Sequence, residues 1–184
     1  PAQEVALRPV DLDEAVRAAV RLSGVSKERF DAVDNLPPGE LVVAIGVGGE
    51  VREIVVPCVS ARWNAPLGDA GTGLAGSRVF FDQANQHGVQ PTSCCRSGGT
   101  LLVRRGGCSL GDKAVHAAAS GAGAVVVCDT EPGRLPGSMD AGRASPTIPG
   151  FMISADSGLE LREALAAGRP VRIARAELRP PSLF

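Results

Sequence analysis

Two apolar segments joined by an Ala-rich stretch constrain the fold of this chain most strongly. The segments at 100–104 and 124–128 have the length of strands, and residues 112–120 between them have the composition of a short helix. A strand-helix-strand order of this size predicts a crossover connection with parallel strands. The second segment, Ala-Val-Val-Val-Cys, has no polar residue, which predicts burial on both faces. The pattern therefore favours an α/β (α+β) fold.

Further elements are expected on both sides of this unit, and the 23 Gly and 14 Pro indicate that they are short and joined by tight turns. They are a strand over 78–82, a surface loop over 129–147, a strand over 150–154, a helix from about Asp156 to Gly168 and a strand over 170–176. The segment Arg179-Pro180-Pro181 then leads out as a stiff linker.

The first 50 residues predict a small β-α-β-β unit. Leu12, Ala15, Val16, Ala19 and Val20 have the spacing of a one-sided helix. Strands are expected over 4–8, 29–33 and 40–47, and Gly48-Gly49 is a hairpin turn into a strand over 51–59. The predicted organisation is thus 1–50 for this unit, 55–176 for the main domain and 177–184 for a tail. An N-terminal extension packed on the main domain is the alternative.

Composition and charge exclude several classes of function. A net charge of −1, with one Trp and no Tyr, gives neither the field nor the stacking platform of a nucleic-acid binder. No apolar run is long enough to cross a bilayer, so direct membrane insertion is not expected. There is no initiator Met and no signal-peptide pattern, and we therefore expect a processed or excised part of a longer protein.

Five cysteines, Cys58, Cys94, Cys95, Cys108 and Cys128, are candidates for disulfides. They lack C-x-x-C spacing and the chain has only two His, so a zinc site is not expected. The adjacent Cys94 and Cys95 cannot easily bridge each other, and pairing with a distant cysteine would place the chain in an oxidising compartment. The alternative is that all five are free thiols. The odd cysteine would be a buried thiol or a cross-link to another chain.

Four short motifs follow one another in the second half of the chain. They are Leu101-Leu102-Val103-Arg104-Arg105-Gly106-Gly107-Cys108-Ser109, Asp112-Lys113-Ala114, Gly121-Ala122-Gly123-Ala124-Val125-Val126-Val127, and Ile148-Pro149-Gly150-Phe151-Met152-Ile153-Ser154 followed by Gly158 and Leu161. In this order they resemble the protease-associated (PA) domain. The chain departs from the family pattern at Leu110, where Phe is common, and at Cys128 inside a core strand. The first unit is also similar to small modules of algal and protist cell-surface proteins, on Gly24-Val25-Ser26, Arg29-Phe30 and Gly39-Glu40-Leu41-Val42-Val43.

The PA resemblance implies a mixed sheet or open barrel with short flanking helices and no catalytic residues of its own. It implies a role in binding peptides or partners, in restricting substrate access or as a spacer. It further implies a bridge from Cys94 or Cys95 to Cys108, and a peptide-binding role for the turn that contains Arg105 and Gly106.

The turn 104–107 and the loop 129–147 are the candidate binding segments. Arg side chains and turn amides can hold an oxyanion, which makes Arg104, Arg105, Gly106 and Gly107 candidates. Solvated charges at a turn are the alternative. In the loop, a flap that contacts a partner competes with a simple variable connection. Its charged candidates are Arg134, Asp140 and Arg143.

Catalytic and cofactor sites are not expected. Cys108 and His116 could be imagined as nucleophile and base, but His116 is predicted on the solvent face of its helix. Gly121-Ala122-Gly123 follows a helix and opens a strand, which is the reverse of a dinucleotide-binding motif. No calcium-loop pattern is present, and His87 is expected to be simply exposed. No metal or cofactor is predicted.

The sequence thus favours a non-catalytic module of a secreted or membrane-anchored protein that binds a protein or peptide partner. The partner could be another domain of the same polypeptide or a neighbouring subunit, in the extracellular space, at the cell surface or in the lumen of the secretory pathway. One alternative is a regulatory module of a protease or other hydrolase whose catalytic residues lie outside this chain. Another is a structural unit of an extracellular assembly.

Overall fold

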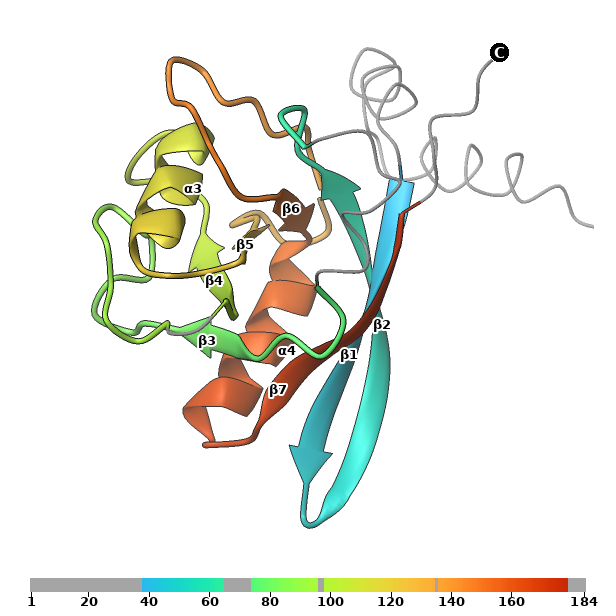
Figure 1. Ribbon diagram of the computed structural model, residues 1–184. Helices are drawn as coiled ribbons and strands as arrows, with labels where there is room; N and C mark the ends of the chain where they lie inside the picture. Colours follow the sequence, from blue (N-terminus) through green and yellow to red (C-terminus); the bar gives the residue numbers. More distant parts are fainter. Residues whose placement is uncertain (1–37, 65–73, 96–97, 135, 179–184) are drawn as a thin grey trace, which may run out of the picture. The chain divides into compact units, whose positions relative to one another are not determined.

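The computed structural model describes residues 38–64, 74–95, 98–134 and 136–178 (Figure 1). The chain divides into two units between Asn35 and Leu36, and all described residues belong to the second. The helix and strands predicted within 1–37, and the linker at 179–181, lie outside the described residues. No helix in the described ranges is long and apolar enough to cross a membrane.

A mixed sheet of seven strands forms the centre of this unit, in the order β3-β4-β5-β6-β2-β1-β7. β3 to β6 pair in parallel, and the other pairs are antiparallel. The strands are β1 (Pro38–Val47), β2 (Glu50–Ser60), β3 (Val79–Phe81), β4 (Thr100–Arg104), β5 (Ala124–Cys128), β6 (Gly150–Ile153) and β7 (Val171–Leu178), and the helices are α3 (Leu110–Ala119) and α4 (Ala155–Ala166). The predicted mixed sheet with short flanking helices is confirmed.

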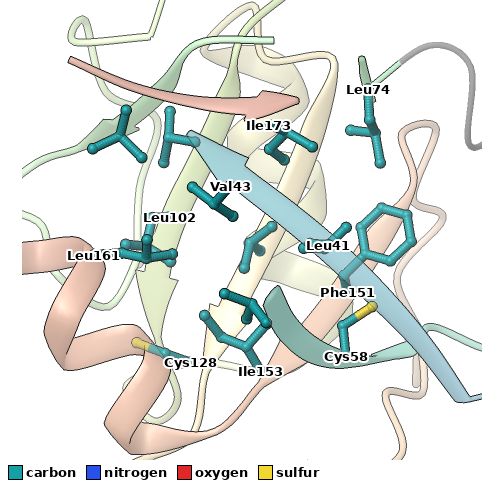
Figure 2. Packing of buried hydrophobic residues seen from close by; sticks show 14 of the residues in the cluster. Leu41, Val43, Cys58, Leu74, Leu102, Cys128, Phe151, Ile153, Leu161 and Ile173 are labelled. Carbon is teal, nitrogen blue, oxygen red and sulfur yellow. The ribbon is translucent and has the colours of Figure 1, made fainter. Parts of the chain in front are cut away.

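Strand β5 is buried on both faces, as its composition predicted. Ala124, Val126 and Cys128 belong to one hydrophobic cluster, which also contains Leu161 and Ala164 of α4, and part of which appears in Figure 2. The intervening residues of β5 belong to a second cluster with two alanines of α3, Ala114 and Ala117. One helix therefore covers each face of the parallel strands, and the alternation along β5 explains why no polar residue fits in it.

Each helix begins at a serine cap and ends near a glycine. Ser109 accepts a hydrogen bond from the Asp112 backbone amide at 3.1 Å, and Ser154 accepts one from Ser157 at 3.2 Å. These bonds satisfy amides that the first turn leaves without a partner. The helices start at Leu110 and Ala155, slightly before the predicted positions near 112 and 156. The caps account for these starts because each immediately precedes the first helical residue.

Strand β1 corrects the predicted N-terminal unit. The sequence pattern predicts that the strand over 40–47 belongs with the first 50 residues, yet β1 pairs with β2 on one side and with β7 on the other. Leu41, Val43 and Ile45 belong to the same cluster as α4. The apolar alternation along this strand matches the core between the sheet and α4, and this burial fixes its place in the seven-stranded sheet.

Candidate functional site

The carboxyl ends of β4 and β5 bring the two predicted binding segments together. Arg105, just after β4, donates its backbone amide to Cys128 O at 2.9 Å, and Asp129, just after β5, donates to Ile153 O at 3.0 Å. The turn after β4 and the start of the loop after β5 therefore lie side by side at the carboxyl ends of these strands. Loops at the carboxyl ends of parallel strands are a common location for binding sites.

Two predicted arginines converge there on a buried carboxylate. Arg105 Nη1 lies 3.2 Å from Asp129 Oδ2, and Arg134 Nε lies 3.8 Å from the same oxygen. The Asp129 side chain has no exposed area, whereas those of Arg105 and Arg134 are 39% and 27% exposed. Arg134 also pairs with Glu131, at 3.0 Å. We call Arg105, Asp129 and Arg134 the arginine cluster.

Asp129 holds the cluster together, although it is not among the site residues predicted from the sequence. A buried carboxylate needs charged or hydrogen-bonding partners to offset its lost hydration. Arg105 reaches both of its oxygens, and Asp129 Oδ1 accepts from the Thr130 amide at 2.7 Å. The signal that could have identified it is a carboxylate directly after a strand that is buried throughout. Such a position lies at the edge of the core.

The glycines of the turn are required by its backbone. Gly106 and Gly107 have φ values of 95° and 80°, in the region that disfavours side chains. A Cβ on Gly107 would also lie 2.7 Å from Val89 Cγ1 and 3.0 Å from His87 Cβ. The turn therefore packs directly on the segment around residue 88.

Lys113 of α3 holds the turn in place through hydrogen bonds to backbone carbonyls. Its side chain is fully buried, and its ammonium donates to the carbonyl oxygens of His87 and of Gly106, the latter at 2.6 Å. Cys108 Sγ lies 3.8 Å from Nζ. Burial lowers the pKa of Lys113 from its ordinary value of 10.5, and the Cys108 thiol opposes that shift. Lys113 thus ties the turn to the segment 86–90 at a cost in desolvation.

Both histidines also form hydrogen bonds with the turn or with the segment 86–90. The prediction that they are exposed is therefore wrong. His87 Nδ1 donates to Arg105 O at 2.9 Å, and His116 Nδ1 donates to Gly88 O at 2.9 Å. Each ring is half-buried. In the described part of the chain no hydrogen bond joins Cys108 to His116; Cys108 Sγ instead donates to Gly88 O at 3.6 Å.

The other predicted site residues lie outside the arginine cluster. Arg104 Nη1 donates to Gln86 Oε1 at 3.2 Å. Asp140 Oδ2 lies 4.0 Å from Arg62 Nη1, and the side chains of Asp140 and Arg62 are both exposed. Arg143 is exposed, with no ion pair to a described residue. The structure therefore joins only Arg105 and Arg134 of the predicted charged set, next to Gly106 and Gly107.

All five cysteines are free thiols in the structure, so the bridge from Cys94 or Cys95 to Cys108 is not formed. Cys58 and Cys128 are buried in the cluster with α4. Burial raises the pKa of Cys58 to about 12 and that of Cys95 to about 11. Within the described ranges no group of three His, Cys, Asp or Glu gathers in a way that could hold a metal ion.

Comparisons with known proteins relate this chain to one family. The sequence model of the PA domain matches residues 70–161, half of the 184 residues. The fold is similar to that of a peptidase M28 precursor from Shewanella amazonensis, with a TM-score of 0.55 and 16% identity over 78% of this chain and 35% of that one.

Two further solved structures are similar at lower TM-scores. An aminopeptidase from Aneurinibacillus has a TM-score of 0.49 and 19% identity, over 89% of this chain and 39% of that one. A zinc aminopeptidase from Bacillus subtilis has a TM-score of 0.47 and 17% identity, over 85% and 38%. The chain therefore spans less than two fifths of the length of any of the three structures. A search among curated proteins gave no match.

Proposed function

Because this chain belongs to the PA domain family, we propose that it is a non-catalytic module of a larger secreted or membrane-anchored protein, and that it binds a protein or peptide at the arginine cluster. One observation carries this proposal: two partly exposed guanidinium groups share a single buried carboxylate. Arg105 and Arg134 bring two positive charges to Asp129, and the exposed Glu131 balances the remaining formal charge at the rim.

The geometry suits an oxygen acceptor on a partner. A guanidinium has five N–H donors, so each arginine keeps donors free after its contact with Asp129. Their fork shape matches a carboxylate or a pair of peptide carbonyls. Since Asp129 is buried and the turn is fastened by Lys113, the guanidinium groups are positioned before binding, which lowers the entropic cost of association.

A display library of random heptapeptides, selected on the immobilised chain, tests this function. The expected result is a family of peptides whose binding weakens about tenfold in the Arg134→Gln variant, because one charge-assisted contact is lost. Arg143→Gln is the matched control, since Arg143 has the same charge and lies in the same loop outside the cluster. Equal effects of both substitutions, or no enriched peptide, would contradict the proposal.

A second candidate is the accessory domain of a peptidase whose catalytic residues lie outside this chain. The fold shared with a peptidase M28 precursor, of which the chain spans about a third, favours it. In the longer protein, Arg134→Gln would then raise KM for peptides while leaving hydrolysis of a small chromogenic amino-acid amide unchanged. A longer protein that cleaves neither substrate would refute this version and leave the binding module intact.

A further inference from the structure

Strand β2 has no described neighbour along most of one edge. It pairs with β1 from Glu50 to Val59, but on its other side it pairs with β6 only from Cys58 to Ser60. Among the described residues no strand pairs with the segment 50–57 on that side. The tip of this hairpin extends beyond β7, whose pairing with β1 reaches only Ile45 (Figure 1). Free edges of this length are templates for an added strand.

The register identifies the groups that the edge offers. Val47 and Glu50 close a two-residue turn, and such a closing pair exchanges both of its backbone hydrogen bonds. The backbone N–H and C=O groups of every second residue of β2, counted from Glu50, therefore point toward β1. Those of the residues between them point away from β1, toward the other edge of the strand. Among the described residues, no backbone group pairs with the outward N–H and C=O of Val51, Glu53 and Val55. Pro57, next in this series, presents only a C=O, which is the position at which an edge strand tolerates proline.

The side chains of these three residues make the edge selective. They share the face of the sheet opposite the cluster that contains α4, because the residues between and beyond them, Ile54, Val56 and Cys58, lie in or against that cluster. Val51 is 69% exposed, Val55 is 58% exposed, and Glu53 between them is also exposed. A strand added to this edge therefore meets two apolar positions on either side of one negative charge.

We infer that the β2 edge binds an extended segment of a partner polypeptide in which apolar residues at alternate positions flank a Lys or Arg. This surface is separate from the arginine cluster. A basic residue opposite Glu53 and apolar residues opposite Val51 and Val55 are the cross-strand pairs that stabilise an antiparallel sheet. Backbone hydrogen bonds supply the affinity, and the three side chains supply the selectivity.

A second copy of this chain fits the edge less well. The antiparallel self-pairing that places Val51 opposite Val55 of a second copy also places Glu53 opposite its own counterpart. Like charges directly opposite each other destabilise a sheet. Shifting the register by two residues brings Pro57 into the pairing in one direction, which removes a hydrogen bond, and in the other direction places Val55 opposite Gly49 of the turn. Charge complementarity therefore favours a basic partner segment.

The test uses the whole chain and two blocked heptapeptides, Thr-Val-Thr-Lys-Thr-Val-Thr and the same sequence with Glu in place of Lys. Binding is followed by NMR through the backbone amides of Val51, Glu53 and Val55. The Lys peptide should shift these three amides and bind more tightly than the Glu peptide. In Glu53→Lys the preference should reverse, with each affinity changing about two- to fivefold.

Two variants serve as controls. Glu163→Lys makes the same charge change on an exposed position of α4 and should leave the preference as it is in the unmodified chain. Val55→Pro removes one outward N–H and should weaken both peptides equally. Unshifted amides at the edge, an unchanged preference in Glu53→Lys, or self-association in place of peptide binding would each overturn the inference.

Discussion

Replacing Lys113 by Met tests whether a buried ammonium fastens the turn beside the arginine cluster. Met has a similar length and no donor, so the carbonyls of His87 and Gly106 would lose their partner. Two hydrogen bonds to a charged group stabilise by about 3–6 kcal/mol together. The variant no longer buries an ammonium, whose lowered pKa reports a desolvation cost, and part of that sum is recovered. We expect a net loss of about 2–4 kcal/mol.

Urea unfolding gives the global effect, and hydrogen exchange shows where it acts. The amides of 86–90 and 106–109 should exchange faster in Lys113→Met, whereas those of β5 should follow the global change alone. Val115→Met, on the exposed side of the same helix, is the matched control. Equal stability to within about 0.5 kcal/mol, with unchanged exchange in the two segments, would refute the fastening role.

Two further substitutions follow, one from the core with a matched control and one from the thiols. Gly158→Ala should destabilise the chain by about 1–3 kcal/mol, because the new Cβ would lie 2.2 Å from Cys128 Cβ. The control Gly137→Ala, whose Cβ meets nothing within 4 Å, should be neutral in the same thermal unfolding assay. Equal shifts in Tm for the two variants would contradict the packing. Since the pKa of Cys58 is about 12 when folded and 9.0 ordinarily, the stability it contributes is fully present below pH 9 and is lost as pH rises toward 12. Between pH 9 and 11 this loss is about 2–3 kcal/mol, and Cys58→Ala should have a flatter pH dependence; an identical slope would show that this thiol does not control it.

The local elements of this fold follow from its sequence pattern, because they depend on neighbouring residues. The strands over 100–104 and 124–128 and the turn at 48–49 agree with β4, β5 and the β1–β2 hairpin. The place of β1 in the sheet does not follow locally. It depends on pairing with β7, more than 120 residues away along the chain, and an apolar alternation does not indicate which core it will join.

The arginine cluster could be predicted only in part for the same reason. The Arg105-Gly106-Gly107 turn and Arg134 were selected from charge and turn chemistry, and the sheet brings them together. Asp129 was missed because its role requires knowing that the ends of β4 and β5 are adjacent. The buried state of Lys113 was missed because a lysine near a helix start normally indicates a solvated position.

The measurement that tests the central claim most directly is NMR of the two guanidinium groups during titration with a peptide enriched in the heptapeptide selection. Binding at the arginine cluster predicts that the Nε–Hε signals of Arg105 and Arg134 shift together and saturate with the same dissociation constant, while that of Arg143 stays in place. A peptide that saturates the chain and leaves both cluster signals unchanged would contradict it.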